Sequence, residues 1–126
     1  MIMKEENEIS RAVVDGAIKV HRALGPGLLE SAYQASLAHL LVKKGYKVEL
    51  EKPQPVTFQD VELDTGYRLD MLINEKVIVE LKAVESINDI HMAQILTYLK
   101  LSKCKLGMIL NFNVRLMKSG IKRVVL

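Results

Sequence analysis

The segment VIVELK, residues Val77–Lys82, decides which fold we expect for this chain. Its aliphatic and β-branched residues predict a strand, because such side chains fit a pleated, half-buried surface. The strand nevertheless ends in Glu80 and Lys82, and a buried strand tolerates charges only where they are paired or bind something. Residues two apart in a strand point to the same face, so one face carries both charges.

The preceding segment, residues 67–73, predicts the other strand of a hairpin whose turn is formed by residues 74–76. A three-residue turn pairs Asp70 directly with Glu80, whereas a two-residue turn would pair Asp70 with Val79. We therefore expect the odd-length turn, or a bulge that restores the register. The opposite face of this first strand is expected to carry four side chains together: Tyr67, Leu69, Met71 and Ile73.

The remaining pattern predicts a single α/β domain, residues 1–126, in which helices flank a mixed sheet. Apolar residues spaced by three and four predict helices over residues 6–24, 28–44 and 87–101. Alternation and apolar runs predict strands over residues 46–51 and 105–112 and a short irregular strand within residues 56–63. Two short basic strands are expected in residues 114–126. The expected order is ααβββαβ with a C-terminal β extension.

Composition narrows the class of protein without deciding its function. A chain of 126 residues that is 49% hydrophobic can form one ordinary core. Its 18 basic residues outnumber its 15 acidic ones, which permits a polyanionic partner but falls short of a basic nucleic-acid-binding tail. The single cysteine excludes an intrachain disulfide, and we see no signal peptide or long apolar run. We therefore expect a cytoplasmic protein without a membrane role.

Three charges occupy positions where a core would place apolar groups. Asp70 and Glu80 are the first two, and Glu30 is the third, because it projects from the inward-facing side of its predicted helix. Two facing carboxylates repel each other unless a divalent cation lies between them, and oxygen ligands suit Mg²⁺ or Mn²⁺. Lys82 beside such a metal could orient a water or neutralise charge on a phosphoryl group. The pattern predicts phosphodiester hydrolysis.

The stretch GLLESAY, residues 27–33, resembles the signature of the GxxExxY proteins, which are similar to the PD-(D/E)XK nuclease superfamily. The resemblance covers most of the chain and implies a restriction-endonuclease-like core. It assigns Glu30 as the helix acid, Asp70 as the strand acid and residues 80–82 as the ExK motif, although Leu69 stands where the superfamily name has proline. Gln94 and Tyr98 match the QxxxY motif of RecB-type exonucleases.

The resemblance also implies the role of each residue. The metal ligands would be Asp70, Glu80 and the Leu81 carbonyl, with Glu30 binding directly or through water. Lys82 would position the attacking water, and Gln94 and Tyr98 would steer the scissile phosphate or support Lys82. The implied cofactor is Mg²⁺ or Mn²⁺, and the implied partner is DNA or RNA.

Each of these residues also has an ordinary structural explanation. Acids and lysines alternate on the solvent face of many strands, an early helix acid suits the helix dipole, and a glutamine and a tyrosine one turn apart can form a helix margin. The order in which the motifs occur favours the functional interpretation. His21 and His39 have no partner at metal-ligand spacing and are predicted to be surface residues.

Two other functions remain open. A nucleic-acid-binding or partner-binding module could keep this fold without turnover, and a phosphodiesterase for small nucleotides would differ only in the shape of its pocket. The sequence does not distinguish DNA from RNA or exonuclease from endonuclease action. It also leaves the oligomeric state open, a homo-oligomer included.

Overall fold

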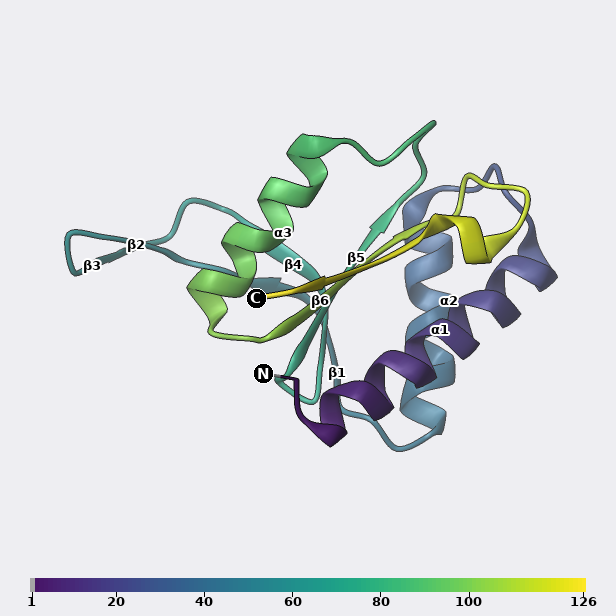
Figure 1. Ribbon diagram of the computed structural model, residues 1–126, viewed down its shortest axis with the longest axis horizontal. Coiled ribbons are helices and arrows are strands. Elements are labelled where there is room, and N and C mark those ends of the chain that lie inside the picture. Colours follow the sequence, from purple (N-terminus) through teal and green to yellow (C-terminus); the bar gives the residue numbers. More distant parts are fainter. Residues whose placement is uncertain (1) are drawn as a thin grey trace.

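The computed structural model describes residues 2–126 and shows a five-stranded sheet between two helical layers (Figure 1). Helices α1 (Lys4–Leu24) and α2 (Glu30–Lys43) cover one face, and α3 (Asp89–Ser102) covers the other. The strands lie in the order β1 (Val48–Pro53), β4 (Arg68–Ile73), β5 (Val77–Lys82), β6 (Leu106–Asn111) and β7 (Ile121–Val125). The predicted mixed sheet flanked by helices is confirmed.

The parallel pair β5–β6 sets the edge of the sheet where charged residues gather. These two strands are joined through α3, as a parallel connection requires, and the other neighbouring strands are antiparallel. Because β5 and β6 run the same way, Lys82 and Asn111 lie opposite each other at the end of both strands. The Phe112 amide also donates to the Lys82 carbonyl. The charged end of VIVELK therefore lies at the carboxyl edge of the sheet.

The sheet separates two apolar cores. Met71, Val79 and Leu81 belong to the core under α1 and α2, whereas Leu72 and Ile78 belong to the core under α3. Leu69 is an exception, because it packs in the α3-side core and not with Met71. The prediction that Leu69 shares a face with Met71 and Ile73 is therefore wrong. The alternation changes at the residue between Leu69 and Met71, which is Asp70.

Local signals explain where the helices begin and end. Asn88 caps α3, since its Oδ1 accepts from the amides of Ile90 and His91 while the His91 ring accepts from the Asn88 amide. Helix α2 begins at Glu30, two residues later than expected, because Leu29 is still extended.

None of the helices within residues 2–126 combines the length and apolar composition that a bilayer crossing requires.

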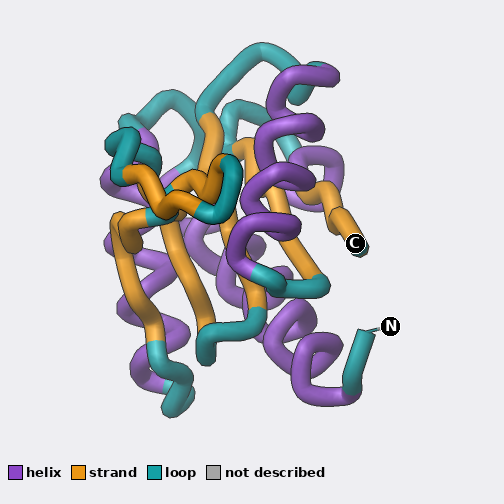
Figure 2. The backbone as a smooth tube through the Cα atoms, turned by 90° about the vertical axis from the view of Figure 1, so that its left-hand side faces the viewer, coloured by secondary structure: helices purple, strands orange, loops and turns teal. Residues whose placement is uncertain are grey.

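Residues 56–63 form two strands where one irregular strand was predicted. β2 (Val56–Phe58) pairs with β3 (Val61–Leu63) as a separate antiparallel hairpin. The turn is tight because Gln59 and Asp60 both adopt left-handed backbone conformations, with φ of 51° and 62°. Figure 2 shows this hairpin and α3 on the same face of the sheet, with the other helices behind the strands.

The C-terminal segment has one strand where two were predicted. Residues 113–116 have no strand partner and lead into the short 3₁₀ helix Met117–Gly120 before β7. Their polar groups have other partners: the Asn111 side chain accepts from the Asn113 amide, and the His21 Nε2 lies 2.7 Å from the Val114 carbonyl oxygen. His21 is therefore buried, and its assignment to the surface was wrong.

Candidate active site

The β4–β5 hairpin is regular at its turn and opens at its far end. The turn has three residues, and the ladder pairs Ile73 with Val77 and Met71 with Val79, so the predicted odd-length turn is confirmed. The next opposed pair is Asp70 and Glu80. Here the Asp70 amide donates to Glu80 Oε2, and the Leu81 amide donates to Asp70 Oδ2, both at 2.9 Å. Carboxylate oxygens thus replace backbone carbonyls between the strands.

This acid pair, Asp70 and Glu80, is electrostatically unusual. Burial and then the charge of Asp70 raise the pKa of Glu80 to about 8, against the opposing effects of the Asp70 amide and Lys82. Burial likewise raises the pKa of Asp70, and the charges of Glu51 and Glu30 add to this effect. At neutral pH the metal-free pair therefore holds a proton that two ordinary carboxyls would have lost.

A small hollow of about 170 Å³ lies beside Asp70 on the α2 side of the sheet. We call it the acid cavity. Helix α2 contributes side chains from its first two turns, and β1, β4 and β5 supply the rest. Its lining residues are Glu30, Ser31, Gln34, Glu51, Asp70 and Leu81. Three carboxylates from three different elements thus face one space.

Glu51 has a backbone conformation that is uncommon for its position. The register of β1 with β4 places it opposite Asp70, between the pairs Leu50–Met71 and Lys52–Leu69. Its φ is nevertheless 51°, a left-handed conformation that few non-glycine residues adopt within a strand, and the ladder is interrupted there. The hydrogen-bond ladder is therefore interrupted at Asp70 on both sides of β4, toward β1 and toward β5.

Gln34 bridges β1 and β4 at the acid cavity. Its Nε2 donates to Glu51 Oε2 at 2.9 Å and to the Asp70 carbonyl oxygen at 2.8 Å. The Asp70 backbone is thus satisfied by side chains at both its amide and its carbonyl. These contacts also explain why Leu69 packs on the α3 side and not where alternation predicts. Without its ladder hydrogen bonds at Asp70, β4 can rotate about its own axis there.

Sequence reasoning missed Gln34 and Glu51. Gln34 could have been found, since it lies one turn after Glu30 and so shares its helix face. Glu51 gave a misleading signal, because it alternates with apolar residues as a solvent-facing acid of an edge strand does. Only the pairing of β1 with β4 reveals that it lies opposite Asp70.

Lys82, Gln94 and Tyr98 lie outside the acid cavity. The half-buried Lys82 is near enough for its charge to lower the pKa of both Asp70 and Glu80, yet within residues 2–126 it forms no ion pair with either. Gln94 and Tyr98 line a different hollow, on the α3 side. The buried Tyr98 still lies near the acid pair, because burial and then the Glu80 charge raise the pKa of its phenol.

The predicted residues therefore fall into two groups that meet at the acid pair. Glu30, Asp70 and Leu81 line the cavity on the α2 side, while Gln94 and Tyr98 line the hollow on the α3 side. Glu80 connects them, since it is bonded to Asp70 and its charge reaches Tyr98.

The acid cavity suits a hard divalent cation by its donor chemistry. Its polar lining offers carboxylate, amide and hydroxyl oxygens and contains no thiol or imidazole, the set that Mg²⁺ and Mn²⁺ prefer. Glu30 and Glu51 also repel the Asp70 charge, and a cation would relieve that repulsion. Within residues 2–126, no three acidic, histidine or cysteine side chains stand close enough together to hold a metal ion. Metal binding would therefore require side-chain rotation, which the exposed Glu30 allows.

Tyr33 fixes the segment that leads into Glu30. Its buried ring stacks on Phe112 with centroids 4.3 Å apart, and its hydroxyl donates to the Gly25 carbonyl and accepts from the Leu28 amide. The loop before α2 is thus tied to the end of β6. Tyr33 therefore packs in the core and holds the loop from which α2 and Glu30 begin.

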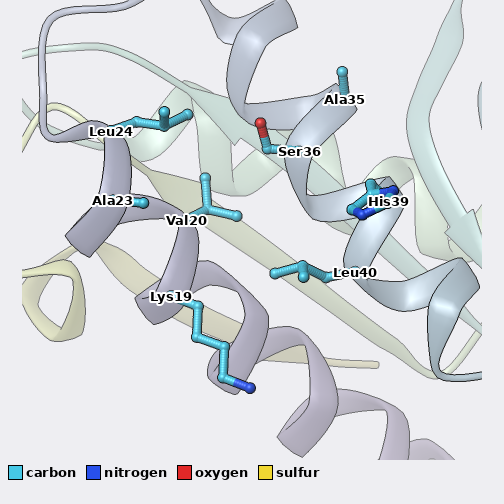
Figure 3. A pocket seen from close by; sticks show the side chains of 8 residues that line it. All are labelled: Lys19, Val20, Ala23, Leu24, Ala35, Ser36, His39 and Leu40. Atoms are coloured by element: carbon cyan, nitrogen blue, oxygen red, sulfur yellow. The ribbon is translucent and has the colours of Figure 1, made fainter.

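A larger hollow of about 520 Å³ between α1 and α2 contains none of the predicted site residues (Figure 3). Lys19 and His39 are its titratable groups, and its other side chains are Val20, Ala23, Leu24, Ala35, Ser36 and Leu40. His39 is exposed, in agreement with its predicted surface position. The hollow lacks the acids that the predicted chemistry requires.

A sequence model of the PD-(D/E)XK nuclease superfamily matches residues 7–124. The chain therefore belongs to this superfamily, and its mixed sheet flanked by helices has the architecture of that fold. Members are typically hydrolytic nucleases that act on nucleic acid and generally use a divalent metal such as Mg²⁺. No curated protein and no solved structure matches the chain significantly.

Proposed function

We propose that this protein is a Mg²⁺- or Mn²⁺-dependent nuclease that hydrolyses phosphodiester bonds in DNA or RNA. The observation that carries the proposal is the open end of the β4–β5 hairpin. There the Glu80 carboxylate accepts from the Asp70 amide, and the Asp70 carboxylate accepts from the Leu81 amide. Lys82 lies close enough to lower the pKa of both carboxyls. Such an acid pair is costly in a merely structural role, because both pKa values are raised by burial.

The proposed metal ligands are Asp70, Glu80 and the Leu81 carbonyl, with Glu30 binding directly or through water. A bound cation would supply charge neutralisation and a more acidic water. Glu80 is bonded to the Asp70 amide and Asp70 to the Leu81 amide, so the strands hold both carboxylates in place. Glu30 is exposed at the start of α2 and can adjust its side chain toward Asp70.

Lys82 is the proposed positioning group for the attacking water. Its ammonium would also offset charge that develops on the phosphoryl oxygens in the transition state. Gln94 and Tyr98 would act from the α3 side, either on the scissile phosphate or on Lys82. The assignment to the QxxxY motif is supported by Tyr98, which the Glu80 charge reaches, and by Gln94, which lines the same hollow. Membership of the GxxExxY branch is proposed from the sequence of residues 27–33.

A second function is a nucleic-acid-binding module with weak or no turnover. The observation that favours it is the separation of the carboxylates, because no metal-binding trio forms within residues 2–126. The raised pKa of Glu80 points the same way, since a protonated carboxyl is a poor ligand. In either case we propose a cytoplasmic location, based on the single cysteine, Cys104, which is buried.

Cleavage assays separate these functions. The purified protein is incubated with Mg²⁺, Mn²⁺ or EDTA and with single-stranded and double-stranded DNA and RNA. We expect metal-dependent cleavage of at least one substrate. We expect Glu80→Gln to abolish this cleavage, although the glutamine side chain can still accept the hydrogen bond from the Asp70 amide. Glu62→Gln, on the exposed β2–β3 hairpin, is the matched control and should cleave normally. Binding without cleavage under every metal would refute the nuclease proposal and support the binding module.

A further inference from the structure

The hollow on the α3 side differs in chemistry from the acid cavity. It has a volume of about 440 Å³, and we call it the aromatic groove. One wall is α3, and the other is formed by the start of the β2–β3 hairpin and the residue before β4. Its lining residues include Val56, Tyr67, Ile90, Gln94, Thr97 and Tyr98. No residue of the lining carries a formal charge at neutral pH.

Tyr67 presents an aromatic ring to this groove. It is 48% exposed, whereas Tyr98 behind it is only 5% exposed. The two rings meet edge to face, with centroids 6.1 Å apart and planes at 61°. Tyr98 therefore fixes the Tyr67 ring and leaves much of it open to a ligand.

The groove adjoins the acid pair through the α3-side core. Tyr98 packs in the same cluster as Leu69 and Ile78. Leu69 precedes Asp70 in β4, and Ile78 lies two residues before Glu80 in β5. Tyr98 shares their core and is near enough for the charges of Glu80 and Asp70 to affect its pKa, so its ring lies near the opening of the hairpin. A chain whose phosphate lies at the acid pair would have a neighbouring nucleotide within reach of the groove.

We propose that the aromatic groove binds an unpaired nucleobase of a single-stranded nucleic acid, which stacks on Tyr67. This inference rests on the proposed function and adds the substrate class. A base is flat and uncharged, as the groove requires, whereas a phosphate would find no cation among the lining residues. Thr97 supplies a hydroxyl for the edge of the base. Inside a duplex the bases are stacked on one another and offer no free face.

The absence of tryptophan from the sequence allows a direct test. Tyr67→Trp places a single tryptophan in the groove, and its fluorescence is titrated with oligothymidylate in EDTA, so that no cleavage occurs. We expect strong quenching by the single strand and little by a duplex of the same length. Phe58→Trp is the control, since Phe58 is exposed on the same hairpin but does not line the groove, and it should be quenched much less.

A binding assay with a labelled oligonucleotide gives the second readout. Tyr67→Ala should weaken single-strand binding by about tenfold, the scale of one lost stacking contact, and Tyr67→Phe should retain it. Mn²⁺ affinity should be unchanged in both variants. Single-strand binding that neither quenches the tryptophan nor weakens in Tyr67→Ala would overturn the inference.

The outcomes also separate this inference from the proposed nuclease function. Quenching with no cleavage under any metal would retain the groove as a base-binding site and reject the nuclease. Cleavage that is unaffected by Tyr67→Ala would retain the nuclease and reject the groove. Fluorescence that changes with protein concentration alone would show a second copy of the chain in the groove, and would reject base binding there.

Discussion

The acid cavity and the aromatic groove lie on opposite faces of one sheet and have opposite chemistry. The acid cavity is small and contains three carboxylates, whereas the aromatic groove is larger, uncharged and bounded by two tyrosines. The acid pair links them, because Asp70 lines the acid cavity and is bonded to Glu80, whose charge reaches Tyr98 in the aromatic groove. In the two proposals, the acid cavity side contributes to metal binding, and the aromatic groove binds the base.

The largest expected effect concerns stability and tests whether the acid pair differs from ordinary carboxyls. The folded-state pKa of Glu80, about 8, is above its unfolded value, so the folded protein keeps a proton that the unfolded chain releases. In EDTA, the free energy of unfolding should therefore fall by about 1.4 kcal/mol per pH unit as pH rises from 5 to 8. Urea unfolding across this range measures the slope.

Glu80→Gln is the variant that checks the cause of this slope. It should remove most of the pH dependence and exceed the wild type in stability at pH 8, because the substituted amide carries no charge to bury. Glu62→Gln should behave as the wild type does. A slope that persists in Glu80→Gln would assign the titration to another group.

The next effect concerns turnover and tests whether the acid pair and Lys82 act together. Lys82→Ala should lower the cleavage rate by about 10² or more, because the lysine acts mainly on charge that develops in the transition state. Its effect on nucleic-acid affinity should stay below about tenfold, the scale of one phosphate contact. Lys43→Ala, at the far end of α2 from Glu30, is the control. A change in affinity alone would favour the binding module.

The smallest effect concerns Glu51, the acid that only the structure revealed. Glu51→Gln should weaken Mn²⁺ binding by about tenfold, as is typical of a residue that supports a metal ligand. The variant can still accept the hydrogen bond from Gln34, so the fold should be retained. Calorimetry with Mn²⁺ measures the change, and an unaltered affinity would restrict the metal site to Glu30, Asp70, Glu80 and Leu81.

The sequence predicted the hairpin well because its turn length fixes its register. Residues 74–76 separate two runs that can bury only one set of side chains, so Asp70 had to oppose Glu80. The sequence failed where side chains replace backbone partners. Alternation places Leu69 with Met71. The Asp70 amide instead donates to Glu80 and the Asp70 carbonyl accepts from Gln34, which interrupts both ladders, and Leu69 packs in the other core.

The separation of the site into two hollows could not be predicted from motif order. Motif order suggests one cluster, yet Glu30 approaches from α2 and Tyr98 from α3, on opposite faces of the sheet. The aromatic groove also depends on residues 56–63. These residues form two strands because the chain turns at Gln59 and Asp60, which are left-handed although neither is a glycine. A left-handed conformation is uncommon for residues other than glycine, so local preference predicts this turn only weakly.

The most direct test of the central claim is calorimetry of Mn²⁺ binding to the wild type and to Asp70→Asn. The substitution removes the charge of a proposed ligand, while the asparagine side chain can still accept the Leu81 amide hydrogen bond, so folding should be retained. Asp60→Asn, in the turn of the β2–β3 hairpin, is the matched control. We predict that Asp70→Asn weakens Mn²⁺ binding by about 10² or more, beyond the loss typical of a supporting residue, and that Asp60→Asn leaves it unchanged. Equal Mn²⁺ affinity in the wild type and Asp70→Asn would contradict a metal site at the acid pair.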